Sequence, residues 1–199
     1  MTVKPSFDLK KILNSLVIVI GVLLIAAAVG LIISQADFSK KQSAQSVVKA
    51  MEAIIPARKR ALPEPHYGGN MPNAEIGGEN FVGLLEVELY NCLLPVGATW
   101  QESDISRFPL SYSGNIYNRD FVVGGSSQTG QFDFVDEIEI GTPVKFIDLY
   151  GREFCYEVSM VKHVDSINSM QSNDDDLTFF AQSKSTSKYV IIRCRLSSV

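Results

Sequence analysis

DLTFFAQSKSTSKYVIIRC, residues 176–194, contains two apolar runs on either side of a polar turn. The runs at 177–181 and 188–196 are rich in aromatic and β-branched residues, which favour strands. The Ser, Thr and Lys residues between them are typical of a turn. The stretch therefore predicts a hairpin. Its first run ends at Ala181-Gln182, a pair that supplies no nucleophile, acid or base.

The same pattern of short runs that favour strands, separated by turn residues, begins near Asn80. The runs that favour strands are FVGLLEVELY (81–90), NCLLPV (91–96), NRDFVVGG (118–125), VKFIDLY (144–150) and FCYEVSMVKHV (154–164). The last two are expected to form a hairpin with Gly151 at its turn. Many short strands with one helix near Val135 predict an all-β fold, a closed or nearly closed barrel.

The N-terminal region has a different composition. Leu16 to Ile33 contains only apolar residues and glycine, and about 20 such residues span a bilayer as a helix. Three lysines precede this segment, and basic residues stay on the cytoplasmic side. We therefore expect a cytoplasmic tail at 1–11, a transmembrane anchor at 12–34 and an extracellular C-terminal domain. A cleaved signal peptide ending at 34–36 is the alternative, but its apolar region would be too long.

Between the anchor and the β-rich region, residues 35–79 are expected to form a stalk helix and a linker. Val47, Val48, Met51, Ile54 and Ile55 have helical spacing. Residues 56–79 are rich in Pro and Gly and have no periodicity, which is typical of a linker. The barrel domain is then expected at 80–199.

Several classes of site are not supported by the composition. The formal net charge of -4 argues against a nucleic-acid partner, which would need a basic face. The three cysteines, Cys92, Cys155 and Cys194, form no CxxC motif and no Cys/His cluster, so a zinc site or disulfide framework is not predicted. The acidic run at 174–176 lacks the spacing of a calcium-binding EF-hand. We expect neither a metal nor a cofactor.

Five stretches in order resemble the sortases, and most closely the class B-like sortases of Gram-positive bacteria. They are FVGLLEVELYNCLLPV (81–96), RFPLSYSGNIYNRDFVV (107–123), GTPVKFIDLYGREFCYEV (141–158), DLTFF (176–180) and YVIIRC (189–194). The resemblance implies an eight-stranded β-barrel with short helices, held at the outer face of the membrane. It also implies a cysteine transpeptidase in which a Cys attacks the sorting-signal peptide, a His transfers the proton and an Arg stabilises the oxyanion.

The resemblance places these three catalytic roles on residues that cannot perform them. The histidine position falls on Ser126, the cysteine position on Gln182 and the arginine position on Tyr189. Serine is no base near neutral pH, and an amide does not attack carbonyls. The hairpin at 176–194 therefore resembles a sortase active-site hairpin without its chemistry.

Three functions follow as hypotheses. The first is a membrane-anchored sortase homologue of a Gram-positive cell surface that is catalytically inactive. It would bind sorting-signal-bearing surface proteins or pilins, or active sortases. The second is an active, divergent transpeptidase that uses Cys194 as its nucleophile. The third is a generic cell-surface interaction module.

Overall fold

The computed structural model describes residues 19–20, 22–25, 44–60, 69–169 and 176–197. The chain divides into two compact units, Met1–Ser39 and Lys40–Val199. In the first unit the described residues are helical and exposed. The predicted tail at 1–11 and most of the predicted anchor at 12–34 lie outside the described residues.

The predicted location, a single-pass membrane protein with its C-terminal domain outside the cell, is wrong. Crossing a bilayer takes a helix of about 20 mostly apolar residues. Within the part of the chain that the structure describes, no helix is both long enough and apolar enough to do so.

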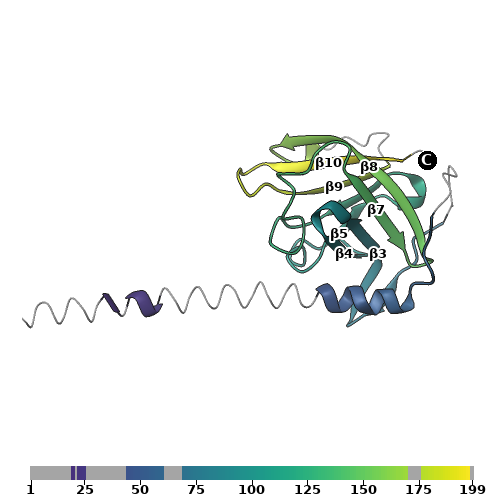
Figure 1. The fold of residues 1–199 in the computed structure, drawn as a ribbon, viewed down its shortest axis with the longest axis horizontal. Helices are drawn as coiled ribbons and strands as arrows, with labels where there is room; N and C mark the ends of the chain where they lie inside the picture. Colours follow the sequence, from purple (N-terminus) through teal and green to yellow (C-terminus); the bar gives the residue numbers. More distant parts are fainter. Residues whose placement is uncertain (1–18, 21, 26–43, 61–68, 170–175, 198–199) are drawn as a thin grey trace, which may run out of the picture. The chain divides into compact units, whose positions relative to one another are not determined.

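The second unit contains a closed β-barrel (Figure 1). Its eight strands pair in the order β3-β4-β5-β6-β9-β10-β8-β7, and β7 returns to β3. Their bounds are β3 Glu79–Val87, β4 Cys92–Gly97, β5 Leu110–Ser113, β6 Phe121–Gly124, β7 Pro143–Asp148, β8 Arg152–Val164, β9 Leu177–Gln182 and β10 Tyr189–Leu196. The expected eight-stranded barrel is therefore confirmed.

Short elements complete this unit. They are β1 Lys59–Arg60, which runs parallel to β8, β2 Ala74–Ile76, which pairs with β3, and the 3-10 helices η1 Glu88–Tyr90, η2 Ile116–Asn118 and η3 Ile167–Ser169. The helix expected near Val135 is absent, because residues 133–137 form turns.

The barrel interior is filled by alternate residues of its strands, as the two-residue period of a strand requires. Phe121, Phe146 and Phe179 are fully buried in this core. Phe179 and Ala181 of β9 point inward, so Phe180 and Gln182 lie on the opposite face of the same strand. This alternation of side chains between the two faces of β9 decides which residues of the hairpin are available to a ligand.

A helix at residues 44–54 packs on the outside of the barrel (Figure 1). Its Met51 is completely buried in a second cluster with Phe81 of β3 and Phe108, and burial of such a side chain contributes about 1.5–3 kcal/mol. The residues for which we expected a stalk thus share a core with the barrel. Residues 61–68 of the expected linker lie outside the described residues.

The hairpin turn between β7 and β8 is organised by Asp148, which is fully buried. Its carboxylate accepts hydrogen bonds from Tyr117 Oη (2.8 Å), from Arg152 Nε (2.6 Å) and from the backbone amides of Tyr150 and Arg152 (2.9 Å each). Gly151 follows with φ +75, a conformation that glycine adopts without strain. The Asp-x-x-Gly element of the motif at 141–158 is therefore structural.

Candidate functional site

Strand register and the adjoining loops bring together the three positions to which the resemblance assigned catalytic roles, Ser126, Gln182 and Tyr189. The parallel pairing of β6 with β9 sets Gly124 beside Phe180, and the antiparallel pairing of β9 with β10 sets Gln182 beside Tyr189. Ser126 lies two residues beyond Gly124, as Gln182 lies two beyond Phe180. The three side chains line one cleft of about 400 Å³. Gln182 is exposed on its rim, and Ser126 and Tyr189 are half-buried.

Four aromatic side chains line the cleft and contact one another: Trp100, Tyr112, Phe180 and Tyr189. Trp100 and Tyr112 meet edge to face with ring centroids 4.9 Å apart, as do Tyr112 and Phe180 at 5.3 Å. Phe180 contacts Tyr189 in the same way at 6.3 Å. We call these residues the aromatic wall. It offers apolar, polarisable faces to a ligand.

The aromatic wall depends on the glycine pair that ends β6. A Cβ on Gly124 would lie 2.3 Å from the ring of Trp100, and one on Gly125 would lie 2.4 Å from the ring of Phe132. Neither distance is compatible with a side chain. Trp100 reaches the cleft because position 124 carries only hydrogen.

Gln131 connects the two loops on either side of the cleft. Its side chain is almost fully buried, accepts a hydrogen bond from the backbone amide of Ser126 (3.1 Å) and donates one to the carbonyl of Ile105 (3.1 Å). Both Ser126 and Ile105 line the cleft. Because a buried amide must be satisfied, the side chain fixes the spacing of the two loops.

The turn between β9 and β10 is also held in place. Ser183 Oγ accepts hydrogen bonds from the amides of Ser185 (3.1 Å) and Thr186 (3.0 Å), and the amide of Lys184 donates to Asp136 Oδ2 (2.8 Å). These bonds fix the end of the hairpin that carries Gln182.

The residues that line this cleft include no cysteine, histidine or arginine. Lys188 precedes Tyr189, but its ammonium group lies 3.5 Å from the carboxylate of Asp165 and it is not a lining residue. Nucleophilic attack on a peptide needs a nucleophile, a base in reach and a group that stabilises the oxyanion. The lining side chains supply polar contacts and apolar surface, which suit binding.

Cys194, the alternative nucleophile, lies elsewhere. It is completely buried in the barrel core, where it pairs in register with Leu177 of β9 and Val158 of β8. It is five residues along β10 from Tyr189, or roughly 17 Å at the rise of a strand. A substrate in the cleft does not reach this thiol.

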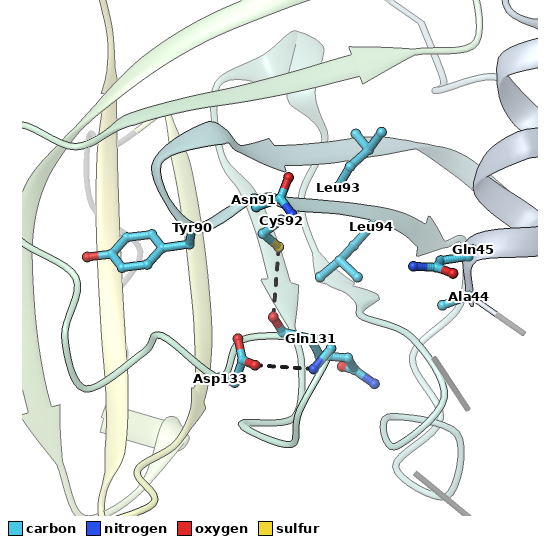
Figure 2. Close-up of a pocket in the computed structure, with 10 residues that line it drawn as sticks. Ala44, Gln45, Tyr90, Asn91, Cys92, Leu93, Leu94, Gln131 and Asp133 are labelled. Atoms are coloured by element: carbon cyan, nitrogen blue, oxygen red, sulfur yellow. Dashed lines mark hydrogen bonds between the residues drawn. The ribbon is translucent and has the colours of Figure 1, made fainter. Parts of the chain in front are cut away.

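A second, smaller cavity of about 170 Å³ lies beside Cys92, between the barrel and the helix at 44–54 (Figure 2). The thiol of Cys92 points toward the loop that carries Gln131 and donates a hydrogen bond to the backbone carbonyl of Gln131 at 3.8 Å. Burial, with a smaller contribution from Asp133, raises the pKa of Cys92 to about 12. The thiol is therefore protonated near neutral pH and is a poor nucleophile.

Of the other acidic and histidine residues noted in the sequence, those that the structure describes do not line the cleft. Asp176 is buried, pairs with Arg119 Nε at 2.5 Å and accepts from the amide of Leu196 at 2.6 Å, a structural role. His163 is exposed on β8, and His66, Asp174 and Asp175 lie outside the described residues. The described part of the chain contains no group of side chains suited to hold a metal ion.

Sequence reasoning overlooked Trp100, Tyr112 and Gln131. Trp100 is the only tryptophan of the chain and lies in a polar stretch, which is a usable signal. Gln131 gives no such signal, because its role arises from contacts with residues distant in the sequence.

No family model matches the sequence, and neither does any curated protein. Solved structures do match. Clostridium perfringens sortase C with the C-terminal cell wall sorting motif matches at 16% identity over 68% of this chain and 79% of that chain, with a TM-score of 0.53. Clostridium perfringens sortase D5 transpeptidase matches at 14% over 59% and 79%, with a TM-score of 0.51.

A third structure, Listeria monocytogenes sortase A, matches at 15% identity over 59% of this chain and 88% of that chain, with a TM-score of 0.50. These likenesses concern the same closed barrel that the strand pairing defines. The chain has a sortase-like fold.

Proposed function

We propose that this protein is a non-catalytic sortase homologue that binds sorting-signal peptides without cutting them. Its partners would be the surface proteins or pilins of Gram-positive bacteria that carry such signals. The observation that carries the proposal is the cleft itself. Ser126, Gln182 and Tyr189 all line it, Gln182 and Tyr189 are direct strand partners, and the lining contains no cysteine, histidine or arginine.

The lining of the cleft supports a protein that binds ligands rather than one that has lost all function. Trp100, Tyr112 and Tyr189, each half-buried, keep an aromatic surface beside the polar Gln182 and Ser126. Pockets that bind peptides and small ligands combine a mostly apolar lining with a few fixed polar groups. The two loops beside the cleft are fixed by Gln131, so the site is formed before a ligand arrives.

The test uses the full-length protein and a synthetic peptide with the cell wall sorting motif. Trp100 is the only tryptophan, so intrinsic fluorescence reports on the cleft directly. Mass spectrometry of the same samples detects cleavage. We expect saturable binding and an uncleaved peptide. A scrambled peptide is the control for sequence preference.

Two outcomes contradict the proposal. Cleavage that disappears in Cys194→Ala would make the protein an active enzyme that uses this thiol. Equal binding of the scrambled peptide, or no binding, would favour a general interaction module without sorting-signal recognition.

A further inference from the structure

The charge of the cleft differs in sign from what the resemblance to sortases implies. The family's pattern places a cationic arginine where this chain has the neutral Tyr189. Among the residues that line the cleft, Glu102 is the only one that carries a formal charge near neutral pH. The lining therefore carries a single negative charge.

Glu102 is available to a ligand. It is exposed, and its carboxylate makes no hydrogen bond or ion pair with the residues that the structure describes. Two cations of neighbouring segments are occupied elsewhere: Arg107 pairs with Glu79 at 2.7 Å, and Lys188 pairs with Asp165 at 3.5 Å.

The aromatic wall adds a second attraction for a cation. Trp100, Tyr112 and Tyr189 are half-buried, so part of each ring is open to the cleft. Aromatic faces attract ammonium and guanidinium groups, and Trp does so most strongly. The carboxylate of Glu102 and the aromatic wall both attract a positively charged group of a ligand. Both repel a negatively charged group of a ligand.

We propose that the cleft selects peptides in which a lysine or arginine adjoins the apolar segment that rests on the aromatic wall. The cationic head pairs with Glu102 while its aliphatic stem lies along the rings, as such side chains do at partly apolar surfaces. This selection rests on the proposed peptide-binding function and adds the class of ligand.

The test compares three forms of one sorting-motif peptide that differ only at a residue flanking the motif: lysine, norleucine or glutamate. Norleucine keeps the stem and removes the charge. Binding to the full-length protein is followed by Trp100 fluorescence. We expect the lysine form to bind about fivefold more tightly than the norleucine form, and the glutamate form to bind most weakly. The preference should shrink at high salt, because an exposed pair is screened.

The variant Glu102→Gln separates charge from packing. It should abolish most of the preference for lysine, so that the lysine and norleucine forms bind with similar affinity. Glu75→Gln is the matched control, because Glu75 is an exposed carboxylate of β2 that does not line the cleft. It should leave the preference intact.

Failure of the proposed selection for cations can be distinguished from failure of the proposed peptide binding. If all three forms bind equally well, or if Glu102→Gln keeps the full preference for lysine, the selection for cations is overturned and peptide binding stands. If no form binds, the proposed function fails and the selection fails with it.

Discussion

Gln182 of β9 and Tyr189 of β10 are direct partners in the antiparallel ladder between the two strands. Opposed residues share a face, and their Cβ atoms lie about 5 Å apart. The positions that the sortase pattern gives to a nucleophile and to an anion-stabilising group are thus neighbours here, occupied by an amide and a phenol. The pair offers a ligand an amide and a hydroxyl group for hydrogen bonding.

Gln182→Cys should create the most reactive thiol of the protein. The position is exposed, whereas Cys92 and Cys194 are buried. In a Cys155→Ser background, which removes the half-buried third thiol, maleimide labelling at neutral pH should be at least about tenfold faster than for the parent. Comparable labelling of the parent would contradict the burial of its two thiols.

Gln182→Cys alone should not confer peptide cleavage. Neither Ser126 nor Tyr189 supplies the base or the positive charge that the reaction needs. The peptide should remain intact by mass spectrometry, and turnover by this single variant would show that another group in the cleft acts as a base.

Gln131→Leu should lower both stability and peptide affinity. It removes the partners of the Ser126 amide and the Ile105 carbonyl, and a buried unsatisfied group costs about 1–3 kcal/mol. Chemical unfolding measures the first effect and Trp100 fluorescence the second. Thr129→Ala, at an exposed position of the same loop, is the control and should change neither.

Gly124→Ala should displace Trp100. The added methyl group would lie 2.3 Å from the indole ring and 2.7 Å from the ring of Phe180, so the aromatic wall must shift. Overpacking of this kind costs about 1–3 kcal/mol. A red-shifted Trp100 emission and weaker peptide binding are expected. An unchanged emission spectrum would mean that the wall tolerates the methyl group.

Asp148→Asn should destabilise the barrel without touching the cleft. It leaves Arg152 without its carboxylate partner and weakens the bond to Tyr117, so we expect a loss of about 3 kcal/mol in the free energy of unfolding. Below the unfolding transition, peptide affinity should equal that of the parent. A loss of affinity in the folded variant would assign this turn a role at the site.

Asp136 should make the β9–β10 turn sensitive to acid. Desolvation acts to raise its pKa, but hydrogen bonds from Ser183 and from the amides of Lys184 and Ser185 outweigh it and lower the pKa from the usual value of an aspartate. A depressed pKa stabilises the fold above the unfolded-state value, and this contribution is lost as pH falls through the folded value.

The amide resonance of Lys184 should report this titration, with a midpoint below that of an aspartate in an unfolded chain. Asp136→Asn should remove the transition. A midpoint above that of an aspartate in an unfolded chain would mean that desolvation dominates the hydrogen bonds.

Local sequence patterns were sufficient to predict most strands of the barrel. The apolar, β-branched and aromatic runs FVGLLEV and KYVIIRCRL, and the turn at Gly151, each act over a few residues, so β3, β10 and the β7–β8 hairpin were predictable. Strand β5 was not predicted, since LSYS is short and weakly patterned. The helix at 44–54 was visible in its spacing, but its packing partner was not.

The sequence by itself determined the all-β barrel, and through the resemblance it predicted catalytic roles for the positions of Ser126, Gln182 and Tyr189. Only the tertiary structure decided what surrounds them. The parallel pairing of β6 with β9 joins segments more than fifty residues apart, and it brings Trp100, Glu102 and the Gln131 bridge to one cleft. Such contacts depend on closure of the whole barrel, because no local propensity encodes which distant loops meet.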